Sequence, residues 1–287
     1  MNNTTFISGF EKSIPLLSDM HTHSENSHDS FCPLSDMCDK QIAAGVSVFA
    51  VTDHYDGCCL AKRDVLAEVE NSIRDIDRHI PEYSNRIEIL RGVEIGEGTW
   101  NAEKEKKVRS LADYDVILGS MHAVRFDTTD NAYSAIDFSG WSRSSILKYI
   151  GKYFDELTEM AEKLDFDILT HIDCPLRYIN GKYNLGIDVF IYEQKIKRIL
   201  DIIIERKIAL EVNTSAMFAK YPLNMPDTRI ISLYRDMGGI MLTVGSDAHT
   251  AENAARGINE ARKFLSGAGF PGTFIFRQRK PIFVPFE

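Results

Sequence analysis

Nine side chains that can bind a metal ion follow short apolar stretches scattered over most of the sequence. They are His21, His23, Asp29, His54, Glu94, His122, His171, Asp247 and His249. Imidazoles and carboxylates without thiolates suit Zn, Mn or Fe, whereas Mg and Ca sites rely on oxygen ligands. A catalytic ion takes roughly three or four protein ligands. If the fold brings them together, nine candidates predict two or three ions that share bridging carboxylates.

Two residue pairs with the same spacing strengthen this prediction. His21 and His23 stand two apart in DMHTHS, and Asp247 and His249 repeat that spacing in GSDAH. Residues two apart on a strand project to the same face, so both members of each pair can reach one point. A single HxH pair is often accidental. Six of the eight histidines, however, stand at the ends of predicted strands, which argues against a random surface or core set.

The elements that must position these residues alternate between strands and helices. Runs typical of strands begin roughly 30 to 50 residues apart, as expected of successive βα units. The predicted strands are 16–20, 46–51, 87–93, 116–120, 167–170, 208–212, 241–244 and 273–276. Helical spacing of apolar residues occurs in 66–80, 146–164, 189–204 and 258–265. A barrel of parallel strands would gather the nine residues in one pocket at the carboxyl ends of the strands.

The chain of 287 residues is expected to form one domain, residues 1–287, because α/β barrels commonly reach about 250 residues as a single unit. No low-complexity tract or linker divides it. The first twenty residues lack the features of a secretory signal, and no later stretch is long enough to span a bilayer. The five cysteines have no CxxC spacing, which disfavours a disulfide framework. We therefore expect a cytoplasmic protein.

The formal net charge of −9 at pH 7 opposes binding to nucleic acid or to an anionic membrane, because both attract proteins through dense Lys and Arg. Basic residues cluster only near the C-terminus, at Arg277, Arg279 and Lys280. A small anionic substrate stays compatible with this charge if bound cations make the pocket locally positive. We expect neither nucleic acid nor a membrane as a partner, and either a monomer or a homodimer.

The motifs HTHS, TDH, VEIG, SMH, THID and SDAH, in this order, resemble those of the PHP (polymerase and histidinol phosphatase) superfamily. The match extends from about Leu16 to His249, which is most of the chain. The resemblance implies an α/β fold, a distorted (β/α)7 TIM-like barrel, with a trinuclear metal site at the C-terminal ends of the strands. The three divalent ions would be Zn, Mn or Fe.

The resemblance also implies how the ligands divide among the ions. One ion would be held by His21, His23, Glu94 and Asp247, a second by Glu94 as a bridge with His122 and His171, and a third by Asp29, His54 and His249. All of these except Asp29 and His54 are expected to be catalytic. The segment SENSHDS offers either His28 or Asp29 as the ligand, and the spacing from His23 favours Asp29.

Four segments, LEVNTSAM, YPLNMPDTRIISLYRDMGG, THIDCPLRYI and FRQRKPIF, resemble monofunctional histidinol phosphatases. They imply a phosphoric monoester hydrolase that converts L-histidinol phosphate to L-histidinol and phosphate in histidine biosynthesis. Alternatives are a phosphoesterase for another small ester and, less favoured by the acidic charge, a nuclease. An amidohydrolase is a further alternative, but its bridging metal site usually contains a lysine at the position where this sequence has His122. The non-enzymatic alternative is a barrel that binds metal without catalytic activity.

Three residues are candidates for substrate binding. Arg177 follows His171 by six residues, and its guanidinium could grip phosphate oxygens in a bidentate fork. Arg125 lies on the segment after His122 and could do the same, although either arginine could simply be a surface residue. Asn213, at the end of the sixth strand, could orient the substrate or bond to neighbouring backbone.

Overall fold

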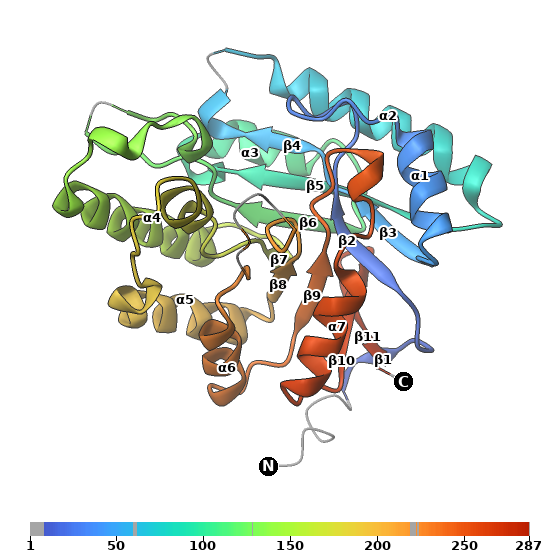
Figure 1. Cartoon of the computed structure of the whole chain (residues 1–287). Coiled ribbons are helices and arrows are strands. Elements are labelled where there is room, and N and C mark those ends of the chain that lie inside the picture. The colour runs from blue at the N-terminus through green and yellow to red at the C-terminus, as the bar shows by residue number, and fades with distance from the viewer. Residues whose placement is uncertain (1–8, 60–61, 128, 219–221, 223, 287) are drawn as a thin grey trace.

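Figure 1 shows the computed structural model of the chain, which describes residues 9–59, 62–127, 129–218, 222 and 224–286. Tyr221 and Leu223, from one of the segments that resemble histidinol phosphatases, lie outside the described residues. No helix in the described ranges combines the length and the apolar character needed to cross a membrane.

Seven parallel strands form a nearly closed barrel, as the sequence predicts. In order around the barrel they are β2 (Ser18–Thr22), β3 (Val48–Val51), β5 (Glu88–Gly96), β6 (Val116–Ser120), β7 (Ile168–Leu169), β8 (Ala209–Asn213) and β9 (Leu242–Gly245). The last strand meets the first through a parallel bridge between Thr22 and Ala248, and the backbone N–H of Asp247 donates to the carbonyl of His21 at 2.8 Å. The predicted distorted (β/α)7 barrel is therefore confirmed.

Helices surround the barrel (Figure 1). They are α1 (Leu34–Ala43), α2 (Val65–Tyr83), α3 (Ala102–Arg109), α4 (Arg143–Lys163), α5 (Glu193–Arg206), α6 (Thr228–Asp236) and α7 (Ile258–Gly267). In α2 the residues Val65, Val69 and Ile76 recur at helical spacing and are buried, which is why this stretch docks on the barrel. A π-helical turn, η6 (Arg177–Lys182), follows β7.

The eighth predicted strand exists but does not belong to the barrel. It is β10 (Gly272–Arg277), which pairs antiparallel with β11 (Lys280–Pro285), while β1 (Glu11–Lys12) pairs parallel with β11. Apolar residues of this three-stranded sheet share one buried cluster with residues of the barrel strands, among them Phe274, Ile282, Val48, Leu118 and Ile168. The sheet thus closes the amino-terminal end of the barrel and leaves the carboxyl end to the predicted ligands.

Candidate metal centre

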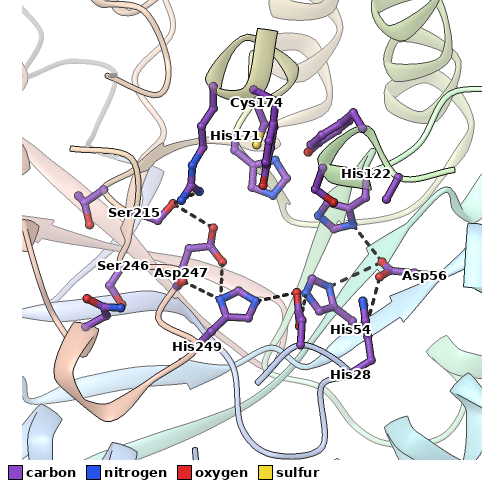
Figure 2. A pocket seen from close by; sticks show the side chains of 18 of the residues that line it. His28, His54, Asp56, His122, His171, Cys174, Ser215, Ser246, Asp247 and His249 are labelled. Atoms are coloured by element: carbon purple, nitrogen blue, oxygen red, sulfur yellow. Dashed lines mark hydrogen bonds and ion pairs between the residues drawn. The ribbon is translucent and has the colours of Figure 1, made fainter. Parts of the chain in front are cut away.

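The strand ends bring all nine predicted ligands to the carboxyl end of the barrel. β2 ends beside His21 and His23, β5 carries Glu94, and β9 leads into Asp247 and His249. The short strand β4 (His54–Asp56), which the sequence did not predict, pairs His54 directly with Glu94. Figure 2 shows His54 of β4 around one cavity with four residues that follow β6, β7 and β9, namely His122, His171, Asp247 and His249. Residues more than two hundred positions apart, such as His21 and Asp247, therefore share one site.

The first group of ligand atoms surrounds His21. Its Nε2 lies 3.0 Å from His23 Nε2, 3.3 Å from Glu94 Oε2 and 3.6 Å from Asp247 Oδ1. His23 Nε2 lies 3.6 Å from the same Glu94 oxygen and 3.3 Å from the same Asp247 oxygen. Two atoms that bind one ion tetrahedrally at about 2.1 Å are roughly 3.4 Å apart. The spacing therefore fits a single ion shared by these four side chains.

The second group uses the other oxygen of Glu94. Glu94 Oε1 lies 3.1 Å from His171 Nε2 and 3.3 Å from His122 Nε2. Because Oε2 faces the first group and Oε1 faces this one, the carboxylate has the geometry of a bridge between two ions. Its side chain is fully buried, and a buried carboxylate needs such charged or hydrogen-bonding partners.

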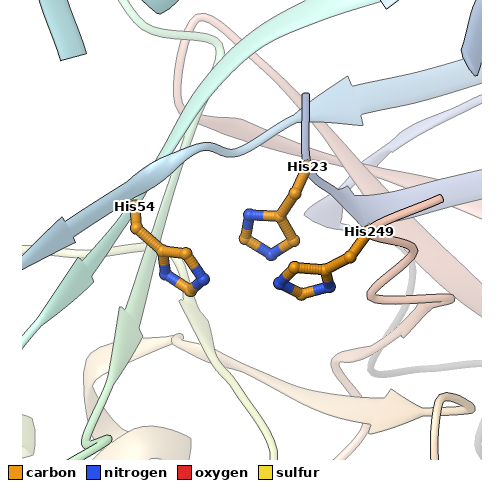
Figure 3. Close-up of side chains that lie close together, drawn as sticks. All are labelled: His23, His54 and His249. Atoms are coloured by element: carbon orange, nitrogen blue, oxygen red, sulfur yellow. The ribbon is translucent and has the colours of Figure 1, made fainter. Parts of the chain in front are cut away.

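The third group contains Asp29, whose carboxylate lies between two imidazoles. Asp29 Oδ1 is 3.6 Å from His54 Nε2, and Oδ2 is 3.3 Å from His249 Nε2. The imidazoles of His23, His54 and His249 lie close together (Figure 3), and the ring centroid of His23 is 4.3 Å from that of His54 and 4.2 Å from that of His249, in stacked geometry. His28 instead points its Nδ1 toward Asp56 Oδ2 at 3.8 Å. The geometry favours Asp29 over His28.

The charge states of His23 and Glu94 suit a cation. Burial, with the nearby imidazoles of His249 and His54, lowers the pKa of His23 to about 3, so His23 is neutral and offers a lone pair. Burial acts to raise the pKa of Glu94, but the imidazoles of His21, His122 and His54 outweigh it and hold this pKa well below its ordinary value. Neutral imidazole beside ionised carboxylate is the donor set that Zn, Mn and Fe accept.

Comparison with known proteins identifies the family. Residues 19–215 match the PHP domain family. The chain belongs to the PHP domain family. It is 28% identical over 255 residues to a probable histidinol-phosphatase of Thermotoga maritima, covering 88% of this chain and 92% of that protein. A probable phosphatase of Edwardsiella ictaluri is 24% identical over 255 residues, with 88% and 86% covered.

A solved structure shares the fold of this PHP domain. It is the histidinol phosphate phosphatase of Lactococcus lactis in complex with zinc, L-histidinol and phosphate. The two structures superimpose with a TM-score of 0.75 at 22% identity, covering 94% of this chain and 99% of the other. The agreement extends over nearly the whole of both chains, so the barrel and its capping sheet belong to one shared architecture.

Three carboxylates that sequence reasoning missed hold the ligands of this PHP domain in place. His21 Nδ1–H donates to Glu211 Oε1 at 2.6 Å, and His122 Nδ1–H donates to Asp56 Oδ1 at 3.0 Å. Both bonds leave Nε2 of the imidazole free to face the ligand groups. Glu97 accepts hydrogen bonds from the backbone N–H of His122 and, at 2.9 Å, of Ala123. A buried Glu within the apolar run LEV is the signal that could have revealed Glu211.

A cavity of about 440 Å³ opens beside the ligands. Arg177, predicted to bind phosphate, lines it, and its Nη1 donates to Ser215 Oγ at 3.2 Å. The Ser215 hydroxyl in turn lies 3.2 Å from Asp247 Oδ2, so the arginine is anchored next to a ligand. Tyr133, Tyr178 and Phe218 add an aromatic part to the lining.

The structure corrects two predicted substrate contacts. Arg125 does not line the cavity, because its guanidinium stacks over the ring of Trp100 at 4.4 Å. Asn213 is fully buried and does not line the cavity, and its Nδ2 donates to Glu211 Oε2 at 3.1 Å and to Asp247 Oδ2 at 3.3 Å. Both assignments rested on proximity in sequence to a strand end, which does not determine where a side chain points.

A second cavity arginine escaped the sequence analysis. Arg256 lines the cavity, its guanidinium lies 4.6 Å from the ring centroid of Phe218, and its Nη1 donates to Asn253 Oδ1 at 3.1 Å. It stands seven residues beyond His249 in a segment without apolar periodicity. No strand end or motif therefore pointed to it.

Proposed function

We propose that the protein is a metal-dependent phosphatase that hydrolyses L-histidinol phosphate to L-histidinol and inorganic phosphate in histidine biosynthesis. The observation that carries the proposal is the pair of oxygens of Glu94, which face two different groups of imidazoles at the edge of a cavity that also holds Arg177. The names of the PHP relatives, histidinol-phosphatase and phosphatase, support the same reaction class.

We assign the nine ligands to three divalent ions of Zn, Mn or Fe. His21, His23, Glu94 and Asp247 would hold one ion, Glu94, His122 and His171 a second, and Asp29, His54 and His249 a third. Such ions, when bound, make water acidic near neutral pH and neutralise the charge on phosphoryl oxygens. The ligand spacing described above supports the first group most directly, because five distances of 3.0 to 3.6 Å connect its four atoms.

The chain itself orients the substrate around this centre. Arg177 presents a planar guanidinium that matches two phosphate oxygens, and Ser215 keeps it next to Asp247. Tyr133, Tyr178 and Phe218 offer aromatic surface to the organic half of the ester, on which an imidazole ring can stack. Holding the ester in this position converts its reaction with water into a positioned, effectively unimolecular step.

A second candidate function is hydrolysis of another small phosphate monoester, favoured by Arg256 at the rim. An additional guanidinium there would suit a substrate with a second anionic group, whereas histidinol carries an amine.

A polyanionic nucleic acid is less compatible. The basic cluster near the C-terminus is used in ion pairs, because Arg277 binds Glu88 at 2.6 Å and Arg279 binds Asp167 at 3.0 Å. We expect a cytoplasmic enzyme that acts on a small metabolite as a monomer or homodimer.

The test measures metal content and activity on the same sample. Zn, Mn and Fe are quantified in the purified protein, and phosphate release is assayed from histidinol phosphate beside a panel of monoesters and diesters. We expect kcat/KM for histidinol phosphate to exceed that for other monoesters by about tenfold or more. Full metal occupancy without hydrolysis of any ester would contradict the phosphatase, and preference for another monoester would favour the second candidate.

A further inference from the structure

Glu211 lies in β8, faces the interior of the barrel and is 1% exposed. Its two oxygens receive three hydrogen bonds. Oε1 accepts from His21 Nδ1 at 2.6 Å, while Oε2 accepts from the backbone N–H of His171 at 2.9 Å and from Asn213 Nδ2 at 3.1 Å. Glu211 does not line the cavity, so it touches ligands from two different strands without being placed to touch a substrate.

The bond to His21 decides which nitrogen of that ring is available. In the neutral ring that binds a metal, with Nδ1–H donated to Glu211, Nε2 carries the lone pair and faces His23, Glu94 and Asp247. A carboxylate behind a ligating imidazole fixes the tautomer and ring orientation and makes the imidazole a stronger donor. At 2.6 Å this contact is short for an N–H···O bond, as expected when the acceptor is charged.

The bond to His171 acts on the backbone. His171 has a φ of 23°, a conformation that L-residues rarely adopt because it is sterically strained. Such a residue keeps its position only when its surroundings fix it. Glu211 Oε2 binds the N–H of His171 directly and therefore holds the strained turn that aims His171 Nε2 at Glu94.

Asn213 extends the contacts of Glu211 to a third strand. The amide of Asn213 donates both to Glu211 and to Asp247 Oδ2, the latter at 3.3 Å. Asp247 also has a positive φ, 52°, and its Oδ1 is the atom that faces His21 and His23. The amide of Asn213 thus connects Glu211, which contacts His21, to Asp247, which is itself a proposed ligand.

From this arrangement we propose that Glu211 is a positioning residue for two neighbouring metal ions. It fixes the orientation of His21 and His171 directly and that of Asp247 through Asn213. The inference rests on the proposed metal centre and deepens it. A buried carboxylate with a purely structural role would add to the stability of the metal-free fold. A positioning role adds something distinct, because it changes the affinity and the geometry of bound metal.

The experiment compares Glu211→Gln with Glu156→Gln. Glutamine keeps the shape of Glu211 but replaces an accepting oxygen with a donating NH₂, so either His21 Nδ1–H or the His171 N–H loses its acceptor. Glu156 is a matched control, since it is 4% exposed, accepts from Trp100 Nε1 at 2.9 Å and lies outside the cavity lining. Zn²⁺ affinity is measured by competition with a chelator, and the visible spectrum is recorded after loading with Co²⁺.

We expect Glu211→Gln to bind its tightest ions about 10- to 100-fold more weakly and to shift the Co²⁺ bands, while Glu156→Gln changes neither. Unchanged affinity and an unchanged spectrum in Glu211→Gln would overturn the inference. Should that variant not fold, Asn213→Ala decides, because the inference requires an altered Co²⁺ spectrum there too. Wild-type protein that binds metal but hydrolyses no ester would contradict the proposed function alone, since neither readout uses a substrate.

Discussion

At the scale of single residues, the metal ligands of the ion-free protein are not all in the protonation state that binds metal. Burial opposes protonation of His54, but Asp56, Glu94 and Asp29 outweigh it and raise its pKa to about 10. The pKa of His122 is raised well above its ordinary value by Asp56 and Glu94 against the effect of burial. These imidazoles must lose protons before they can bind an ion.

Metal affinity should therefore rise with pH. The protonated form of His54 stabilises the ion-free fold fully below its unfolded pKa of about 6.5, and this contribution is lost as pH rises through about 10. Between these values bound protons compete with the ions. We expect calorimetric titration with Zn²⁺ to show weaker binding at pH 6.5 than at pH 8.5, with protons released to the buffer. Binding that is independent of both pH and buffer ionisation enthalpy would contradict this.

Replacing His122 tests the second ligand group. His122 Nε2 lies 3.3 Å from Glu94 Oε1, and its side chain is 16% exposed. His122→Ala should lower kcat/KM by about 100-fold or more, since even residues that only support ligands cost up to that much, with a modest change in Tm. His79→Ala is the control, because His79 is buried in α2 away from the cavity. Wild-type turnover in His122→Ala would exclude His122 from the site.

The clustering of the nine predicted residues could be foreseen from the sequence, but the carboxylates that contact them were not identified. His21, His23 and Asp247 stand in motifs with strand-like spacing, which the barrel then brings together. Among the 42 acidic residues, Glu211 is marked only by the apolar residues on either side of it, and nothing in the spacing of Asp56 distinguishes it from a surface carboxylate. Arg177 and Arg125 looked alike in sequence, yet only Arg177 lines the cavity.

At the scale of elements, close packing between strands β8, β9 and β2 restricts what the site can tolerate. Gly245, the last residue of β9, has no side chain, and a Cβ there would lie 2.5 Å from both Glu211 Oε1 and His21 Cβ. No flexible tip could move aside, because both neighbours are fully buried. The glycine therefore allows the carboxylate and the imidazole to meet behind the metal centre.

Gly245→Ala should destabilise the protein by about 1–3 kcal/mol and weaken metal binding, since Glu211 and His21 must separate. Gly151→Ala should do the opposite to stability. Gly151 lies inside α4, and an added Cβ would meet only Tyr192 Cε1 at 3.5 Å, so alanine there gains about 0.5–1 kcal/mol of helix stability. Chemical denaturation and chelator competition measure both variants. Equal metal affinity in Gly245→Ala and the wild type would refute the packing argument.

Comparison of the strands with their predicted ranges shows which features the sequence pattern predicts and which it does not. Strand β6 matches its predicted range, and β2 and β3 begin within two residues of theirs. Strand β4 was missed because three residues are too few for a periodic signal. The strand predicted at 273–276 is present as β10. The spacing of apolar residues within a strand does not show which other strand it pairs with, so the position of β10 outside the barrel could not be predicted.

At the scale of the whole molecule, the sheet of β1, β10 and β11 fastens the chain end to the bottom of the barrel. Arg279, in the turn between β10 and β11, donates to Asp167 at 3.0 Å and to Asp165 at 2.9 Å. Asp167 precedes β7 and is 8% exposed, and it also accepts from the backbone N–H of Ile117 at 2.8 Å. Two of the three basic residues of this cluster, Arg277 and Arg279, thus have structural roles.

Arg279→Ala should cost about 1–3 kcal/mol in the free energy of unfolding, because it leaves the nearly buried Asp167 without its cation. The kcat of the variant should remain that of the wild type, since the turn lies at the end of the barrel opposite to the cavity. Urea denaturation followed by an ester assay checks both expectations. A fall in kcat without loss of stability would contradict the assigned role.

We propose that residues 1–287 unfold as one domain. The apolar cluster shared by Phe274 and Phe276 with Val48 and Ile168 couples the capping sheet to the barrel, so neither should melt alone. Scanning calorimetry of the metal-loaded protein should show one transition whose van't Hoff and calorimetric enthalpies agree. Two separate transitions would assign the sheet to a unit of its own.

The position of the capping sheet also shows where a label or a linker can be joined to the enzyme without covering the cavity. Lys280 is exposed at the start of β11, at the end of the barrel that the substrate does not enter. A dye, a surface linker or a fusion partner joined there would leave the cavity mouth open to solution. Attachment at this one position would therefore leave the predicted ligand cluster facing the solution.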